Sequence, residues 1–221
     1  MAAMDTAQLT ALAAALGWAS GLRLYAAVFI TGLAGSQGWI ALPAGLQVLQ
    51  HPALLAASGF MLFVEFFADK IPGVDTLWDA VHTFIRIPAG AALAAAALGA
   101  DGAVLTTAAA LLGGTLAATS HAAKASTRLA VNTSPEPFSN WLVSFAEDGL
   151  VVGALWLATQ HPLWFAAALA LALVLMVCLI ALLAKFLKLV LNRLASWFGV
   201  TPAPAIAAAP TQVTYDTNHH P

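Results

Sequence analysis

The feature that most constrains this chain is an apolar segment from Leu163 to Ala184 that contains no charged residue. A helix that spans a bilayer needs about 20 apolar residues, and a helix that is apolar on all sides has no exposed face in water. Across the chain, 61% of the residues are hydrophobic and 8% are charged, whereas soluble domains carry roughly 25% charged residues. The sequence therefore predicts an all-α integral membrane protein.

Pro- and Gly-containing breaks separate the apolar runs and predict about six transmembrane helices. The expected helices are Ala7–Ala34, Ala53–Asp69, Thr76–Leu98, Ala103–Val131, Ser139–Thr159 and Leu163–Ala184, the last with an amphipathic extension to Phe198. Two of them are expected to be broken, near Gly21-Leu22-Arg23 and at Pro88-Ala89-Gly90. We assign residues 1–199 to one polytopic transmembrane domain and residues 200–221, which are Ala/Pro-rich and then polar, to a disordered tail.

The basic residues predict the orientation of the chain. Six crossing helices place both termini on one side of the membrane, together with the loops that follow the second and fourth helices. Every Lys and Arg except Arg23 falls on that side. Because basic residues concentrate in cytoplasmic segments, we expect both termini in the cytoplasm.

Charged and polar residues repeat at helical spacing near this cytoplasmic side. Positions three, four and seven apart share one face of a helix. Four expected helices carry such polar stripes: Glu65 and Asp69; Asp75, Asp79, His82 and Arg86; His121, Lys124 and Arg128; and Asn140, Ser144 and Glu147, with Asp148 beside them. Lys70 adjoins the first stripe, and Arg23 joins the group if the first helix unwinds there.

The composition of the stripes separates two interpretations. Long basic side chains that extend into lipid headgroups explain Lys185, Lys188 and Arg193. In the stripes acidic residues are as frequent as basic ones, and the side chains of Asp and Glu are too short to extend into the headgroups from within the membrane. An unpaired charge within a membrane costs several kcal/mol, so we expect these groups to pair inside the helix bundle or around a wet cavity.

A polar cavity open to the cytoplasm is the functional hypothesis that follows. Arg86, Lys124 and Arg128 would bind an anionic group, while the carboxylates of Glu65, Asp79, Glu147 and Asp148 would balance the charge or relay protons. His82 and His121 titrate near neutral pH and would couple solute movement to protons. A purely structural network that holds the helices together remains the alternative.

Two motif blocks support a resemblance to a known family. The first runs from Val64-Glu-Phe-Phe-Ala-Asp-Lys-Ile-Pro-Gly-Val-Asp75 through Asp79, His82 and Arg86 to Pro88-Ala-Gly90, and the second combines His121, Lys124, Arg128, Asn132-Thr-Ser-Pro-Glu-Pro137, Ser139-Asn140 and Glu147-Asp148. With Gly21-Leu-Arg-Leu-Tyr25, they resemble the bacterial membrane-protein family called domain of unknown function 4126 over about Gly17 to Pro162. The resemblance implies a bacterial cytoplasmic (inner) membrane protein and names no activity or substrate.

The leading interpretation is a small transporter or channel-like permease for a polar or anionic solute. A lipid flippase or scramblase, a metal-dependent enzyme acting on lipid phosphate, and a membrane assembly protein are the alternatives. For the enzyme, the ligands would be Asp75, Asp79, His82, Glu65, Asp69 and His121, although the interleaved bases would repel a cation. We expect no cofactor, no nucleic-acid partner, contact with the lipid bilayer, and a homodimer. The sequence leaves open whether an internal repeat is parallel or inverted.

Overall fold

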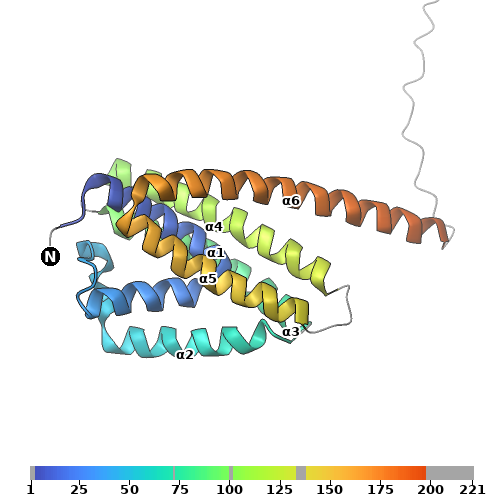
Figure 1. Ribbon diagram of the computed structural model, residues 1–221, viewed down its shortest axis with the longest axis horizontal. Coiled ribbons are helices and arrows are strands. Elements are labelled where there is room, and N and C mark those ends of the chain that lie inside the picture. The colour runs from blue at the N-terminus through green and yellow to red at the C-terminus, as the bar shows by residue number, and fades with distance from the viewer. Residues whose placement is uncertain (1–2, 72, 100–101, 133–137, 198–221) are drawn as a thin grey trace, which may run out of the picture. The chain divides into compact units, whose positions relative to one another are not determined.

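A computed structural model describes residues 3–71, 73–99, 102–132 and 138–197. All regular structure in these ranges is helical: α1 (Thr6–Ser36), η1 (Ala44–Gln50), α2 (Pro52–Ala68), α3 (Val74–Leu98), α4 (Ala103–Val131), α5 (Phe138–Gln160) and α6 (Pro162–Trp197) (Figure 1). Five helices are long and apolar enough to cross a membrane, or six if η1 and α2, bent by 71°, form one span. The prediction of an all-α membrane protein with about six apolar helices is confirmed.

The domain prediction is only partly covered by the described residues. Contacts between residues divide the chain into one compact unit up to Leu183 and a second from Ala184 onward. The first unit contains α1 to α5 and most of α6, and it holds every residue of the predicted polar stripes. The single domain at 1–199 stays a prediction, and the tail at 200–221 lies outside the described residues.

Helix α1 begins at a capping box and is broken near its middle. The Asp5 side chain accepts from the Gln8 backbone N–H at 2.8 Å, and the Gln8 side chain accepts from the Asp5 backbone N–H at 3.0 Å. Arg23 has φ −145° and ψ 78°, which is not helical, so α1 consists of two helical halves joined at this residue. The sequence predicted an interruption here.

The two halves of α1 run in opposite directions (Figure 1). At its start, the Gln8 side chain donates to Thr159 O at the end of α5. Near its finish, Gly35 packs against Gln50 of η1, and η1 in turn packs against Ala96 near the end of α3. Helices α3 and α5 run in the same direction, so their last residues lie at the same end of the bundle. The start of α1 lies beside the end of α5, and the end of α1 lies, through η1, beside the end of α3. Both ends of α1 are therefore at that same end of the bundle.

This reversal changes the predicted topology. The expectation that both termini share one side required the first helix to cross the membrane. Helix α1 turns back at Arg23, so it does not cross from one side to the other. Asp5 and Gln8 lie at the end of the bundle where α3 and α5 finish, and Asp69, after the last residue of α2, lies at the opposite end. The sequence did not show the reversal, because one non-helical residue can either kink a helix or turn it back.

Small residues let the first half of α1 pack closely against α3 and α4. A Cβ added to Gly17 would lie 2.6 Å from the Gly113 Cα on α4, and one added to Gly90 on α3 would lie 3.2 Å from Gly17 O. Ser120 Oγ donates to Trp18 O at 2.7 Å across the same interface. Close backbone approach at small residues is a common basis of helix association in membranes, and it holds α1 inside the bundle.

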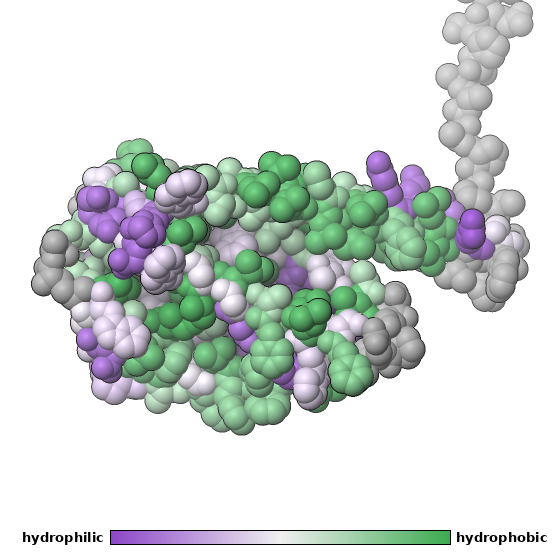
Figure 2. Space-filling view, in the orientation of Figure 1, coloured by the Kyte–Doolittle hydropathy of each residue, from purple (hydrophilic) through white to green (hydrophobic). Residues whose placement is uncertain are grey.

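The outward surface is hydrophobic. Figure 2 shows apolar side chains over the helices on the displayed face, with polar side chains gathered where α1 begins and α5 ends. Large apolar residues such as Phe84 (83% exposed) and Leu163 (80% exposed) point away from the protein interior. A soluble protein rarely presents so much continuous apolar surface, so these faces contact the lipid bilayer.

Candidate functional site

The break in α1 lies inside a group of buried charges. The first half of α1 ends with backbone carbonyls that have no partner within the helix. Lys124 Nζ of α4 donates to one of them, Leu22 O, at 3.1 Å. The Arg23 side chain is fully buried and extends from the break toward α5, where its Nη2 donates to Ser144 Oγ at 2.6 Å and Ser144 O at 3.1 Å. The broken tip of α1 is therefore held by polar contacts from two other helices.

Asp69, directly after α2, is the first centre of the charged group. Its Oδ2 lies 2.8 Å from Lys124 Nζ, 3.0 Å from Arg23 Nη1 and 3.6 Å from Arg128 Nη2. Burial acts to raise the pKa of this carboxyl, but the three cations outweigh it and hold the pKa below its usual range. Asp69 therefore stays ionised as a fixed counter-ion.

Glu147 on α5 is the second centre. Its Oε2 accepts from Arg128 Nη2 at 2.8 Å and lies 3.5 Å from both Lys124 Nζ and Arg23 Nε. Asp69 and Glu147 thus share the same three cations. We call these five residues the central cluster: Arg23, Asp69, Lys124, Arg128 and Glu147.

A second group surrounds Arg86 of α3. Its Nη1 donates to Asp79 Oδ1 at 2.6 Å and its Nη2 donates to Glu65 Oε1 at 2.5 Å. Asp79 Oδ1 also lies 3.4 Å from Lys124 Nζ, which joins this group to the central cluster. All four side chains are at most 4% exposed. The charges balance across the two groups, as mutual pairing within the bundle requires.

The two histidines border these charges. His121 Nδ1 lies 3.3 Å from Arg86 Nη1, and its Nε2 lies 2.6 Å from Thr83 Oγ1. His82 Nδ1 donates to Trp78 O at 2.8 Å, and its Nε2 is hydrogen-bonded to the Tyr25 hydroxyl at 3.2 Å. Each ring is oriented by a partner on another helix.

Asp75, Lys70 and Asn140 occupy different surroundings from the other predicted residues. Asp75 accepts from Asn132 Nδ2 at 3.0 Å through both carboxylate oxygens, and Asn140 Nδ2 donates to Asn132 Oδ1 at 2.9 Å. Among the described residues, the side-chain amides of this group reach the central cluster through long contacts of 3.4 Å from Arg128 to Asn140. Lys70 makes no ion pair within 4 Å in the described ranges and donates instead to Phe66 O and Ser144 Oγ.

Several buried charged atoms keep unused hydrogen-bonding capacity. In the described part of the chain these atoms have no hydrogen-bond partner, although some lie within ion-pair distance: Arg23 Nε and Nη1, Glu65 Oε2, Asp69 Oδ1, Asp79 Oδ2, Arg86 Nε and Arg128 Nε. Buried polar atoms are normally paired, and these atoms lie together where the charged side chains of the helices meet.

Some residues at the site were not among the predicted ones. Ser144, which bridges Arg23 and Lys70, and Tyr25 were visible in the sequence only as members of a stripe and of a family motif. Thr83 lies beside His121 although it is one position from the predicted face of α3. A hydroxyl at helical spacing is too common in membrane helices to be singled out without its partner.

The carboxylates and histidines are not arranged around a common metal position. In the ranges that the structure describes, no three His, Cys, Asp or Glu side chains could together hold a metal ion. Glu65, Asp69, Asp79 and Glu147 each face an arginine or lysine instead. These carboxylates are therefore counter-ions of basic side chains in the structure.

Comparison with known proteins identifies one family. The family model described as domain of unknown function (DUF4126) matches residues 10–182, which include the whole charged site. No curated protein and no solved structure matches the chain.

Proposed function

The chain belongs to the family of domain of unknown function 4126, and from its geometry we propose that it is a small membrane transporter for a polar or anionic solute. The observation that carries the proposal is the helical hairpin of α1, whose broken tip at Arg23 lies among buried charges. Broken helices whose irregular backbone faces an interior polar site are a recurrent feature of transporters, because such backbone is tolerated in a membrane only where protein or a cavity surrounds it.

The central cluster supplies the solute site in this proposal. Arg23, Lys124 and Arg128 converge on two carboxylates, and arginine is well suited to bind carboxylate or phosphate groups through paired N–H donors. An anionic solute can enter only if a carboxylate gives up part of its interaction with these cations. Protonation of that carboxylate makes the exchange electrically neutral.

Glu147 is the carboxylate that we assign to this exchange. Asp69 stays ionised, as its lowered pKa indicates. Glu147 contacts the same three cations and retains slight exposure, at 5%. One proton on Glu147 would accompany each single negative charge, which couples solute entry to protons. His82, His121 and Asp79 border the path that such a proton would take.

Orientation forms part of the proposal. We place the chain in the cytoplasmic (inner) membrane, with the end that carries Lys70 and Arg128 facing the cytoplasm because basic residues concentrate there. The hairpin of α1 then enters and leaves from the opposite face, so Asp5 and Gln8 lie outside. A homodimer remains a prediction.

Proton movement in liposomes tests this function. Purified protein is reconstituted with a trapped pH-sensitive dye, and inward gradients of phosphate, sulfate or small carboxylates are applied. We expect one of these anions to speed acidification inside the liposomes. Glu147→Gln should slow that anion-dependent acidification by about a hundredfold, a loss typical of removing a proton-transferring group.

Asp5→Asn is the matched control, because it also neutralises one carboxylate and asparagine caps a helix as well as aspartate does. Its acidification rate should equal that of the unmodified protein. The proposal is wrong if no anion speeds acidification, or if Glu147→Gln transports at the unmodified rate.

A further inference from the structure

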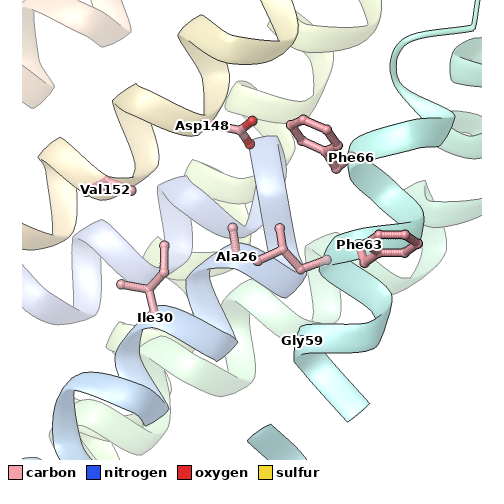
Figure 3. Close-up of a pocket in the computed structure, with 8 residues that line it drawn as sticks. Ala26, Ile30, Gly59, Phe63, Phe66, Asp148 and Val152 are labelled. Carbon is pink, nitrogen blue, oxygen red and sulfur yellow. The ribbon is translucent and has the colours of Figure 1, made fainter. Parts of the chain in front are cut away.

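An apolar crevice opens between α2 and α5 on the side of the bundle away from α4. Its volume is about 390 Å³, and it is lined by Ala26, Ile30, Gly59, Leu62, Phe63, Phe66, Asp148 and Val152. The second half of α1 forms its floor (Figure 3). Phe63 is 61% exposed and flanks the opening, so the crevice faces the region that lipid chains occupy. Its size lies within the range of small-molecule sites.

Asp148 is the polar group in this lining. Its side chain points from α5 across the crevice toward Phe66 (Figure 3). One carboxylate oxygen, Oδ1, lies 3.2 Å from Arg23 Nε, and the side chain is 28% exposed. Among the described residues, the other oxygen has no hydrogen-bond partner. A carboxylate exposed to an apolar crevice is costly unless a cation meets it.

Lys70 provides the opposite charge next to Phe66. Its Nζ lies 2.9 Å from the centre of the Phe66 ring and 4.7 Å from that of Phe145. Two of its N–H groups donate to Phe66 O and Ser144 Oγ, which leaves the third for another acceptor. Burial and the nearby Arg23 charge lower the pKa of the Lys70 ammonium by more than Asp148 and Asp69 raise it, so a further anion beside it would be stabilising.

The order of these groups along α5 defines the ligand. Lys70 contacts Ser144, Asp148 lies one turn further along the helix, and Val152 lines the crevice one turn beyond Asp148. An occupant with its chain in the crevice therefore meets the carboxylate first and the lysine second.

We propose that this crevice binds a membrane amphiphile whose apolar chain is followed first by an amine, which pairs with Asp148, and then by an acidic group, which pairs with Lys70. The site adjoins the central cluster through Arg23 but does not include Glu147 or Lys124. Binding at the crevice therefore goes beyond the proposed transport function and does not depend on it.

Two single-chain lipids with the same charged groups in opposite order test the proposal. In sphingosine 1-phosphate the amine comes before the phosphate along the chain, and in lysophosphatidylethanolamine it comes after. Native mass spectrometry of the intact chain in dodecyl maltoside gives the dissociation constant of each. We expect sphingosine 1-phosphate to bind roughly tenfold more tightly, because only its order allows both charged contacts.

Two variants test where the lipid binds. Val152→Trp fills the crevice from an exposed position and should weaken sphingosine 1-phosphate binding by roughly tenfold or more. Val81→Trp is the control: it introduces the same side chain at a comparably exposed position on α3 and should leave binding unchanged. Asp148→Asn should remove the preference between the two lipids. It leaves Arg23 paired with Asp69 and Glu147.

Four results would overturn the proposal. Three of them are equal binding of the two lipids, unchanged binding by Val152→Trp, and a preference that survives in Asp148→Asn. Soluble phosphoethanolamine is the last probe: if it binds as tightly as sphingosine 1-phosphate, the apolar chain contributes nothing and the site is not a lipid site. None of these measurements requires transport, so they stand apart from the liposome experiment.

Discussion

Arg86→Gln is expected to lower the free energy of unfolding by about 3–5 kcal/mol, the usual cost of breaking a buried ion pair by removing one partner. Arg86 is fully buried and is the cation paired with Glu65, while Asp79 retains a contact with Lys124 at 3.4 Å. The substitution leaves the Glu65 charge without compensation. Chemical or thermal unfolding of the detergent-solubilised protein measures the loss.

A double variant separates charge from packing. Glu65→Gln combined with Arg86→Gln removes both members of the pair, so it should be more stable than Arg86→Gln alone. Arg193→Gln, at an exposed position on α6, should change stability by less than about 0.5 kcal/mol. If the double variant is less stable than Arg86→Gln by the full cost of a second independent substitution, the pairing account is wrong.

Gly113→Val is expected to disrupt the packing of α4 against α1 and α3. A Cβ at this position would lie 2.6 Å from Gly90 O and even closer to the Ala94 Cβ. Backbone and short side chains cannot move aside, so the cost should exceed the roughly 1–3 kcal/mol typical of overpacking. We expect a large drop in melting temperature and loss of the monodisperse peak in size-exclusion chromatography.

Gly149→Val is the matched control for this prediction. Gly149 lies in α5, and an added Cβ meets no other atom within 4 Å. The melting temperature should be unchanged or slightly higher, because glycine is a poorer helix former than valine. Equal destabilisation by both substitutions would mean that glycine itself, and not close helix contact, matters at these positions.

The polar side chains that the sequence grouped are largely those that the structure brings together. Helical spacing predicted the shared faces of Asp79 with Arg86 and of Lys124 with Arg128, because that spacing depends only on helix geometry. It could not predict which face met which. The Asp69 carboxylate contacts three basic side chains from α1 and α4. Asp75, six residues later in the sequence, accepts a hydrogen bond from the Asn132 amide instead.

The direction of α1 after its break could not be predicted from the sequence. Gly21-Leu22-Arg23 indicated a break, but its angle depends on tertiary contacts: Lys124 holds Leu22 O, and Gly17 fits against Gly113. The crevice beside Asp148 depends on how α2 and α5 are placed relative to each other, which no local pattern encodes. Distances between helices that are far apart in sequence determine both features.

Access of water to the central cluster tests the account most directly. Ser144 is fully buried between Arg23 and Lys70, and Ser120 is fully buried in the packing of α1 against α4. In a Cys178→Ala background, which removes the only native cysteine, Ser144→Cys and Ser120→Cys are exposed in liposomes to a charged, membrane-impermeant thiol reagent. A transporter must open its site to water, so Ser144→Cys should be modified while Ser120→Cys stays unmodified. If neither variant reacts, the charged network is sealed and structural, and the transport proposal is wrong.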